Sequence, residues 1–296
     1  MWLADQWNDY EVIDCSKGEK LERWGDYLLV RPDPQVIWDT PKKEKGWRKM
    51  NGHYHRSSKG GGEWEFFQLP KEWTIQYSLP INKKLTFHLK PFSFKHTGLF
   101  PEQAANWNWF SQLIADAVSK GRQVKVLNLF AYTGGATLAA AAAGASVTHV
   151  DASKGMVTWA KENAISSGLK DAPIRWLVDD CVKFVEREIR RGNHYDAIIM
   201  DPPSYGRGPK GEIWKIEESV YPLVKLCTQI LSDDPLFFLV NSYTTGLAPA
   251  VLTYMISLEL KQYKGHVAAQ EIGLPVKSTG LVLPCGASGR WQSDNV

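Results

Sequence analysis

The stretch that decides the fold is Lys125-Val-Leu-Asn-Leu-Phe130-Ala-Tyr-Thr-Gly134-Gly135-Ala-Thr-Leu-Ala-Ala-Ala-Ala-Ala143. Its apolar start, bounded by a turn signal, is typical of a strand buried on both faces of a parallel sheet. The two glycines lack a Cβ, so they allow a sharp turn and the close approach of a ligand. The alanines that follow are strong helix formers. The pattern predicts a strand, a tight loop and a helix whose free N–H groups can receive an anion, which together form a cradle for a small ligand.

Two further strand ends narrow the choice of ligand. Asp151 follows the apolar run 146–150, the position where a nucleotide-binding βαβ unit places an acid against the ribose hydroxyls. A dinucleotide site would carry Gly-x-Gly-x-x-Gly, and the single pair Gly134-Gly135 argues against NAD. Another buried run, 195–200, delivers Asp201-Pro-Pro-Ser-Tyr205 to the same edge of the sheet. Together these features resemble a class I methyltransferase that uses S-adenosylmethionine.

An ordered set of motifs points to one family among the class I methyltransferases. The motifs are His96-Thr-Gly-Leu-Phe-Pro-Glu-Gln103, Asn128-Leu-Phe-Ala-Tyr-Thr-Gly-Gly135, Asp151-Ala-Ser153, Asp180 and Asp201-Pro-Pro-Ser-Tyr205. In this order they are similar to the bacterial large-subunit ribosomal RNA methyltransferase I-like family, over roughly residues 85–285. The resemblance implies S-adenosylmethionine as cofactor and a base of ribosomal RNA as acceptor.

The arrangement of apolar runs predicts an α/β fold. Strands are expected near 124–130, 146–150, 174–178, 195–200 and 235–241, with helices of ordinary length between them. This alternation gives a Rossmann-like, mostly parallel sheet covered on both faces, with ligands at the carboxyl ends of the strands. The runs 266–270 and 281–285 would form the closing pair that supplies the one antiparallel strand. Residues 1–94 are predicted to form a smaller β-rich domain, and residues 95–296 the methyltransferase domain.

The resemblance assigns residues to the cofactor. The assigned residues are Thr97, Phe100, Gln103, Tyr132, Thr133, Gly134, Gly135, Asp151, Ser153, Asp180 and Asp201. Asp151 would accept hydrogen bonds from the ribose diol, and Asp180 one from the adenine amino group. Asp179 could make the contact with adenine in place of Asp180. Either acid could instead cap the helix expected at 182–191. Where the family often has Asp-Gln-Arg, this chain has Glu102-Gln103-Ala104, so the arginine contact is missing.

The catalytic residues expected from the resemblance are Asp201, Pro202 and Tyr205. The proline pair fixes the backbone, so that a carboxylate and a carbonyl can point at one acceptor group while Tyr205 stacks on its base. The amino-methyltransferase pattern carries its aromatic residue directly after the prolines, whereas here Ser204 intervenes, which weakens an exocyclic amine as the acceptor.

Methylation of cytosine C5 would need a cysteine thiolate that attacks the ring. The strand end where the family places this cysteine reads Val240-Asn-Ser-Tyr-Thr-Thr-Gly246 and has none. Cys227 is expected inside a helix, and Cys285 is expected to end the returning antiparallel strand, at the edge away from the ligand. We therefore expect direct transfer without a covalent intermediate.

The amino-acid composition limits the classes of protein to which the chain can belong. The chain has 296 residues, of which 44% are hydrophobic and 23% charged, with a net charge of +3, as is ordinary for a globular protein. Its four cysteines are far apart, so neither a metal site nor a disulfide framework is expected. The N-terminus lacks a signal-peptide pattern, and no apolar run reaches membrane-spanning length. A cytoplasmic protein that does not enter a membrane is predicted.

Two basic segments suggest RNA as the partner. Segment 42–64 interleaves lysines and arginines with aromatic rings, which suits phosphates and unstacked bases, and 206–211 is a basic loop beside the proline pair. The alternative for both is a solvated loop, in the first case with rings packed beneath it. Two other functions stay open: a methyltransferase for a protein or small molecule, and a cofactor-binding module without catalysis.

Overall fold

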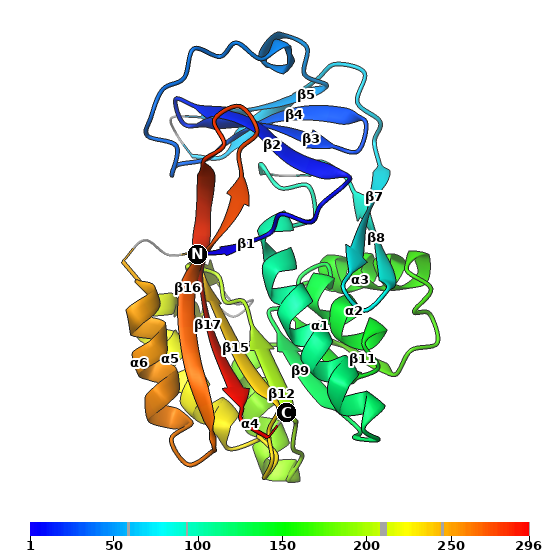
Figure 1. The fold of residues 1–296 in the computed structure, drawn as a ribbon, viewed down its shortest axis with the longest axis vertical. Helices are drawn as coiled ribbons and strands as arrows, with labels where there is room; N and C mark the ends of the chain where they lie inside the picture. Colours follow the sequence, from blue (N-terminus) through cyan, green and yellow to red (C-terminus); the bar gives the residue numbers. More distant parts are fainter. Residues whose placement is uncertain (58–59, 93, 208–211, 244–245, 296) are drawn as a thin grey trace.

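The computed structural model describes residues 1–57, 60–92, 94–207, 212–243 and 246–295. A small N-terminal sheet lies above a larger α/β layer, and the N-terminus lies between the two (Figure 1). None of the helices in these ranges has the length and apolar character that crossing a bilayer requires.

The larger layer is built on an eight-stranded sheet in the order β1-β16-β17-β15-β12-β9-β10-β11. Its strands are β1 (Trp2–Leu3), β9 (Lys125–Leu129), β10 (Ser146–Asp151), β11 (Ile174–Val178), β12 (Ala197–Met200), β15 (Phe237–Ser242), β16 (Gly265–Pro275) and β17 (Val282–Ser293). β17 is antiparallel to both of its neighbours, and all other neighbours in the described sheet pair in parallel. The predicted Rossmann-like sheet with one antiparallel strand is confirmed.

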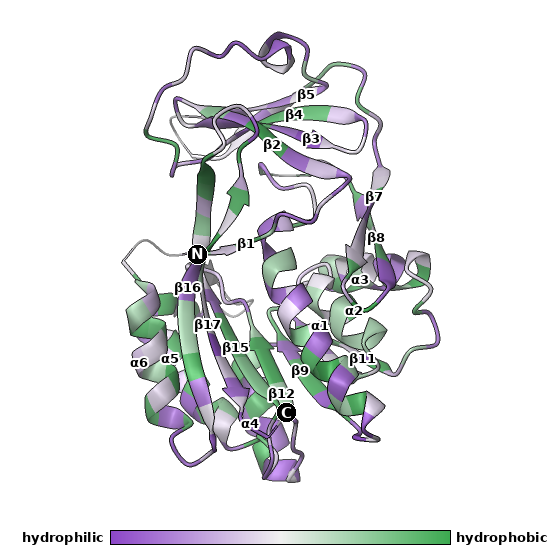
Figure 2. Ribbon diagram, viewed as in Figure 1, coloured by the Kyte–Doolittle hydropathy of each residue, from purple (hydrophilic) through white to green (hydrophobic). Residues whose placement is uncertain are grey.

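Two layers of helices cover this sheet and bury its apolar strands. All residues of β12 and β15 are buried, which explains the apolar runs 197–200 and 237–240 (Figure 2). The helices are α1 (Ala104–Ser119), α2 (Gly135–Ala142), α3 (Lys154–Ser166), α4 (Cys181–Arg191), α5 (Ile216–Thr228) and α6 (Pro249–Glu259). The first three pack into one apolar cluster and the last three into a second cluster, on opposite faces of the sheet.

The N-terminal part is rich in β-strands. A five-stranded sheet contains β2 (Tyr10–Ser16), β3 (Glu19–Trp24), β4 (Tyr27–Pro32), β5 (Gly52–Arg56) and β6 (Gly62–Phe66), and β7 (Trp73–Leu79) pairs with β8 (Lys83–Leu89) in a hairpin. Short 3-10 helices lie at Lys45–Arg48 (η1) and Pro101–Gln103 (η2), and β13 (Tyr205–Arg207) pairs with β14 (Ile213–Lys215). The predicted strands in segments 64–94 and 1–40 are thus present.

Three segments connect the two parts. β1 joins the large sheet beside β16, so the first residues of the chain belong to the larger layer. The tip of the β16–β17 hairpin reaches the small sheet, where the Lys277 amide N–H donates to the Val12 carbonyl at 3.0 Å. The β7–β8 hairpin rests on α3, and the His88 amide N–H donates to Asn163 Oδ1 at 2.8 Å. The domain boundary between residues 94 and 95 stays a prediction.

Candidate active site

Four loops meet at the carboxyl edge of the large sheet. In the register of the parallel strands, Leu129 of β9 lies beside Val150 of β10 and Met200 of β12, and Val150 lies beside Leu177 of β11. The loops that follow these strands therefore begin side by side. This is the edge at which open α/β sheets bind their ligands.

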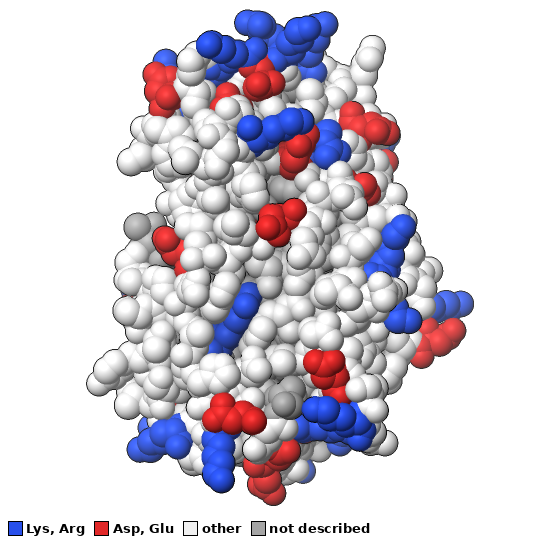
Figure 3. Space-filling model, in the orientation of Figure 1, with Lys and Arg blue, Asp and Glu red and all other residues white. Residues whose placement is uncertain are grey.

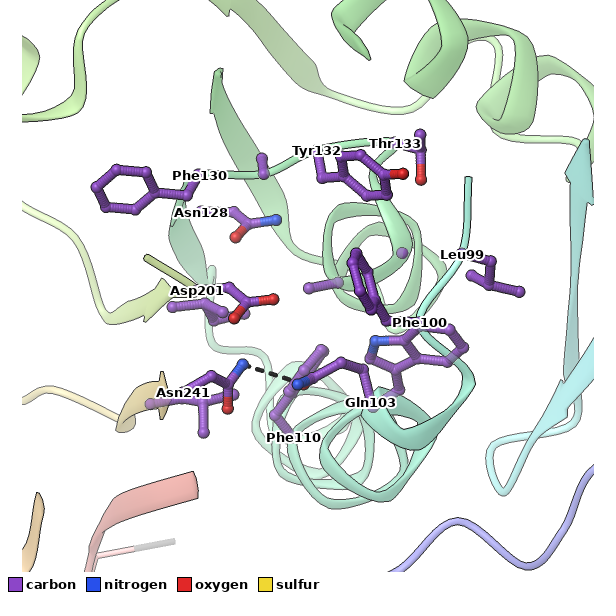
Figure 4. A pocket seen from close by; sticks show the side chains of 16 residues that line it. Leu99, Phe100, Gln103, Phe110, Asn128, Phe130, Tyr132, Thr133, Asp201 and Asn241 are labelled. Atoms are coloured by element: carbon purple, nitrogen blue, oxygen red, sulfur yellow. Dashed lines mark hydrogen bonds between the residues drawn. The ribbon is translucent and has the colours of Figure 1, made fainter. Parts of the chain in front are cut away.

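A small cavity of about 50 Å³ lies at this edge (Figure 4). It is lined by Leu99, Phe100, Gln103, Trp107, Phe110, Asn128, Phe130, Ala131, Tyr132, Thr133, Gly135, Ala136, Ile199, Asp201, Leu239 and Asn241. The Tyr132 hydroxyl and Asp201 Oδ1 are buried there without a hydrogen-bond partner among the described residues. Buried polar atoms are nearly always paired. These two are therefore suited to the polar groups of a ligand.

The loop between β9 and α2 is held in an unusual conformation. Phe130 and Tyr132 have positive φ angles of 54° and 52°, a region that is uncommon for residues with a Cβ, and Gly134 has a φ of 86°. The Asp151 carboxylate braces this loop by accepting the amide N–H groups of Tyr132 and Ser153, each at 2.8 Å. Burial raises the pKa of Asp151. The carboxylate does not cap α3, because Ser153 Oγ accepts the Met156 amide N–H instead, at 3.4 Å.

Gly135 lines the smaller cavity and also allows its backbone to pack closely against Trp107. A Cβ at this position would lie 2.6 Å from Cζ2 of the buried Trp107 ring. Gly135→Ala is therefore expected to destabilise the protein by about 1–3 kcal/mol through overpacking. In the matched control Gly155→Ala, the new Cβ would meet nothing closer than Ser153 Oγ at 3.8 Å. That change should be neutral or stabilise by roughly 0.5–1 kcal/mol. Urea unfolding measures both, and equal effects would contradict this role for Trp107.

Gln103 is locked in a buried network of amide side chains. Its Oε1 accepts from Asn106 Nδ2 at 2.9 Å and from Asn241 Nδ2 at 3.0 Å, and its Nε2 donates to the Tyr243 hydroxyl at 2.6 Å. Arg290 Nε completes the network by donating to Asn106 Oδ1 at 2.9 Å. Figure 4 shows the Gln103–Asn241 contact beneath Asp201. The network fixes the floor of the cavity.

Of the other predicted cofactor residues, Thr133 and Gly135 line this cavity, whereas Thr97, Gly134, Asp151, Ser153 and Asp180 do not. Thr133 lines it and donates its hydroxyl to the Gly98 carbonyl at 2.5 Å, while Thr97 is fully buried behind it. Asp180 caps α4 by accepting the Lys183 amide N–H at 2.9 Å. A helix cap was one of the two roles that the sequence left open for this residue. Asp179 pairs with Arg187. A contact of either acid with adenine stays a prediction.

Asp201 stands at the end of β12 with its carboxyl group turned into the cavity (Figure 4). Burial, with a further effect from Glu102, raises the pKa of Asp201 to about 7. Pro202 is buried beside it. Tyr205 lies in β13 with a relative exposure of 51% and lines neither this cavity nor the next one. The structure thus brings Asp201 to the site, whereas stacking by Tyr205 stays a prediction.

A second, larger cavity of about 420 Å³ adjoins the first, between the small sheet and the carboxyl edge of the large one. It is lined by Lys20, Arg31, Asp33, Pro34, Gln35, Lys95, His96, Leu99, Phe100, Pro101, Glu102, Pro203, Ser204, Tyr243, Pro284 and Cys285. Leu99 and Phe100 line both cavities, so they form the wall between them. Two polar compartments thus share one wall beside the tip of β12.

The expected position of Cys285 is wrong. Cys285 lies near the start of β17, and because this strand is antiparallel, its start is at the same edge as the ends of the parallel strands. The side chain therefore lines the larger cavity. Burial, together with the Glu102 carboxyl group, holds the pKa of the Cys285 thiol well above its usual range. The thiolate that a covalent mechanism needs is thus disfavoured at this position. Cys227 is buried in α5, as expected.

Residues that the sequence did not single out also line the cavities. Asn241 lies near the end of β15 and Tyr243 directly follows it, so the rule that ligands meet strand ends would have found them. The strand-end rule does not point to Lys20, Arg31 and Lys95, because these residues approach the carboxyl edge of the large sheet from the N-terminal part of the chain. No group of three or more His, Cys, Asp or Glu side chains in the described ranges is placed to hold a metal ion.

Residues 42–49 of the basic segment pack on the outer face of the small sheet, whereas residues 52–56 and 62–64 belong to its strands β5 and β6. Glu19 contacts Lys42 at 3.0 Å and His53 at 2.7 Å on that face, while the adjacent Lys20 points the other way, into the larger cavity. The exposed cations of the segment are Lys43, Lys45, Arg48, Lys49 and Arg56. Figure 3 shows lysines and arginines gathered over this end of the molecule. Lys59 and residues 208–211 of the second basic loop lie outside the described residues.

Comparisons with known proteins show which family the chain resembles. A family model described as S-adenosylmethionine-dependent methyltransferase matches residues 53–217. The crystal structure of the SAM-dependent methyltransferase from Agrobacterium tumefaciens is 37% identical, with a TM-score of 0.87 over 96% of this chain and 90% of that chain. A methyltransferase structure from Streptococcus mutans, 18% identical, shares the fold with a TM-score of 0.73 over 97% of this chain and 76% of that chain.

Curated relatives carry the name ribosomal RNA large subunit methyltransferase K/L. The relative from Pseudoalteromonas atlantica is 27% identical over 263 residues, which cover 78% of this chain and 34% of that protein. The relative from Shewanella frigidimarina is 34% identical over 146 residues, which cover 47% of this chain and 19% of that protein. The chain therefore spans about a third or less of the length of these relatives.

Proposed function

The chain belongs to the S-adenosylmethionine-dependent methyltransferase family, and from this premise we propose that it methylates a base of RNA, with large-subunit ribosomal RNA as the acceptor. The names of the curated relatives support this acceptor, and so do the exposed cations on the N-terminal part. The observation that carries the proposal is the unpaired Asp201 Oδ1 in the smaller cavity, with Pro203 and Ser204 lining the larger one. The proposed setting is the cytoplasm.

The smaller cavity, of about 50 Å³, would hold only part of the cofactor, whose other groups would lie along its rim. Backbone groups of Tyr132 to Gly135 would meet its methionine end, Asp151 its ribose, and Phe100 and Gln103 would border it. The unpaired Tyr132 hydroxyl offers one more polar contact. When bound, S-adenosylmethionine supplies a methyl group on a positively charged sulfur. We propose that Thr97, Ser153 and Asp180 lie at the edge of the cofactor site. They would support it by holding the loop and the helix ends in which they lie.

Asp201 is proposed to place the acceptor. Its buried carboxylate accepts a hydrogen bond from the acceptor group, so that the lone pair of this group faces the methyl carbon. The new bond forms as the bond between methyl and sulfur breaks, the electron pair stays on sulfur, and the acceptor proton passes to Asp201 Oδ1. Pro202 holds the carboxylate in place, and Tyr205 is proposed to stack on the base once RNA is bound. No cysteine takes part.

The test is transfer of an isotope-labelled methyl group to RNA. The purified protein is incubated with labelled S-adenosylmethionine and deproteinised large-subunit ribosomal RNA, and the nucleosides are then separated by mass spectrometry. We expect one methylated base, missing from the same RNA of cells that lack the gene. Label that enters protein or small molecules but not RNA would contradict the RNA assignment. Absence of transfer to any of these acceptors would favour a non-catalytic binding module.

One observation favours a small acceptor as the second candidate. Lys42 lies on the face of the small sheet opposite to that of Lys20, which lines the larger cavity, so an RNA that touched both would have to reach around the small sheet. A small anionic acceptor would need only the cations inside the cavity. Adding a low-molecular-weight cell extract in place of RNA to the same assay distinguishes the two.

A further inference from the structure

Resting on the proposed function, we propose that the larger cavity is the acceptor site, and that it takes one nucleotide turned out of its RNA strand. In this arrangement Lys95 binds the phosphate of that nucleotide and Glu102 faces its base. The cavity of about 420 Å³ falls within the range of about 300–1,000 Å³ for sites that hold one small molecule. It therefore admits a single nucleotide rather than a duplex. Enzymes that act on a base generally take it out of the stack.

The wall between the two cavities offers aromatic faces for a base. The Phe100 ring lies 5.7 Å from the Tyr243 ring and 5.4 Å from the His96 ring, measured between centroids. Both neighbouring rings line the larger cavity with Phe100. Burial, together with Arg31 and Lys95, lowers the pKa of His96 to about 4, so its ring is neutral at pH 7. An unstacked base can stack on such rings whatever its identity.

The cations of the cavity differ in how they are paired. Arg31 holds Glu22 through two hydrogen bonds of 2.6 and 2.8 Å, and Lys20 lies 3.2 Å from Asp33. Lys95 Nζ donates to the Pro32 carbonyl at 3.0 Å, and within the described part of the chain it has no carboxylate partner within 4.0 Å.

Lys95 is thus a partly buried ammonium group without a counter-ion. Burial, together with Lys20 and Arg31, lowers the pKa of Lys95 to about 8, so the group is still mostly charged at pH 7. A buried charge is stable when it is paired, and a phosphate oxygen is a strong acceptor for an ammonium group. The unmatched charge therefore points to an anionic ligand.

Glu102, in η2, also lines this cavity and has a relative exposure of 7%. Burial raises the pKa of its carboxyl group. No described side chain forms a hydrogen bond with this carboxyl group. A carboxyl group in this position can donate to or accept from the edge of a base that stacks on the exposed face of Phe100 or Tyr243. The lysine and the acid that line this one cavity thus offer contacts to the phosphate and the base of one nucleotide.

The test compares Lys95→Gln with the control Lys84→Gln, in which an exposed lysine of β8 loses its charge. Initial rates are measured on large-subunit ribosomal RNA across a range of salt concentrations. Loss of one phosphate contact should raise KM by about tenfold, equivalent to about 1.4 kcal/mol, and should lower the slope of log KM against log salt concentration by about 0.7. Lys84→Gln should change neither. The dissociation constant of S-adenosylmethionine should be unchanged in both variants.

Each outcome of this test decides between alternatives. If the wild type methylates RNA but Lys95→Gln behaves like Lys84→Gln, the acceptor-site assignment falls and the proposed function stands. If the wild type methylates no RNA, both fall. A third arm offers free nucleoside 5′-monophosphates at millimolar concentration. Methylation of these at the rate seen with RNA would show that the cavity takes free nucleotides, and would overturn the assignment of a nucleotide turned out of a strand.

Discussion

Replacing Asp201 with asparagine is expected to lower kcat roughly 10²- to 10⁴-fold, the range typical for loss of a group that accepts the acceptor proton. Asparagine keeps the shape of the side chain but cannot take the proton. The Asp201 carboxyl group meets the smaller cavity through Oδ1, which has no other partner among the described residues, so the change should disturb little else. The affinity for S-adenosylmethionine should stay measurable.

The same substitution is expected to stabilise the protein above pH 7. An unfolded aspartic acid ionises near pH 4, whereas the pKa of folded Asp201 is raised to about 7. The native state therefore holds this proton longer, and stability falls as the pH rises from about 4 to 7. Asparagine removes this loss. Asp201→Asn should thus be more stable than the wild type at pH 8, by on the order of 3 kcal/mol, and nearly equal to it at pH 4.

Turnover and unfolding measured on one protein preparation test both expectations. We expect kcat/KM of the wild type to rise between pH 6 and 8, as Asp201 loses its proton. The control Asp171→Asn, at an exposed position in the loop before β11, should change neither activity nor stability. Unchanged turnover in Asp201→Asn would remove Asp201 from the mechanism. A loss of stability at pH 8 would show that its carboxylate has a stabilising partner in the folded protein.

Local sequence patterns predicted the parts of the site that lie within the large sheet. Apolar runs that end in a glycine pair or an acid give both the strand and the edge it reaches, because parallel strands deliver their ends together. Thus the loops at Gly134, Asp151, Asp180 and Asp201 could be placed side by side from the sequence. The strongest of these local signals was the stretch around Gly134.

The parts that were missed depend on contacts distant in sequence. Cys285 was assigned to the wrong edge because a run of apolar residues does not reveal where in a strand it lies, and β17 continues to Ser293. The packing of Gly135 against Trp107, which lies 28 positions earlier in the chain, gave no local signal in the sequence. Lys95 carries no motif at all. Its significance follows from the pairing of Arg31 with Glu22, which leaves Lys95 without an acid.

The buried pair of Glu22 and Arg31 leads to the second large expected effect. Glu22 has a relative exposure of 0%, and it accepts two hydrogen bonds from Arg31 and one from the Tyr10 hydroxyl at 2.7 Å. Glu22→Ala would leave the Arg31 charge buried without its partner. We expect a loss of about 3–5 kcal/mol in the free energy of unfolding, because a buried charge is costly once unpaired. The partly exposed pair Glu11–Arg23 is the control, and Glu11→Ala should lose about 1 kcal/mol or less.

The dependence on pH separates this ion pair from simple packing. Against the opposing effect of burial, Arg31 and Lys20 lower the pKa of Glu22 to about 2. Since the unfolded pKa is near 4.3, the pair stabilises the protein fully above that pH, and this contribution is lost as the pH falls toward 2. The difference in stability between the wild type and Glu22→Ala should therefore shrink in acid. A difference that stays constant from pH 7 to pH 3 would show that lost packing, and not lost charge, is responsible.

The double variant Glu22→Leu, Arg31→Met tests whether the Glu22–Arg31 pair positions Lys95 in the proposed acceptor site or contributes to stability alone. Two apolar side chains of similar size should restore most of the stability that Glu22→Ala loses, because neither leaves an unpaired charge. Arg31 Nη1 also donates to the Lys95 carbonyl at 2.9 Å, and this contact would be lost. A stable double variant with a raised KM for RNA would show that the pair positions Lys95. A stable double variant with an unchanged KM would show that the pair acts on stability alone, and that Lys95 is held by its contact with the Pro32 carbonyl.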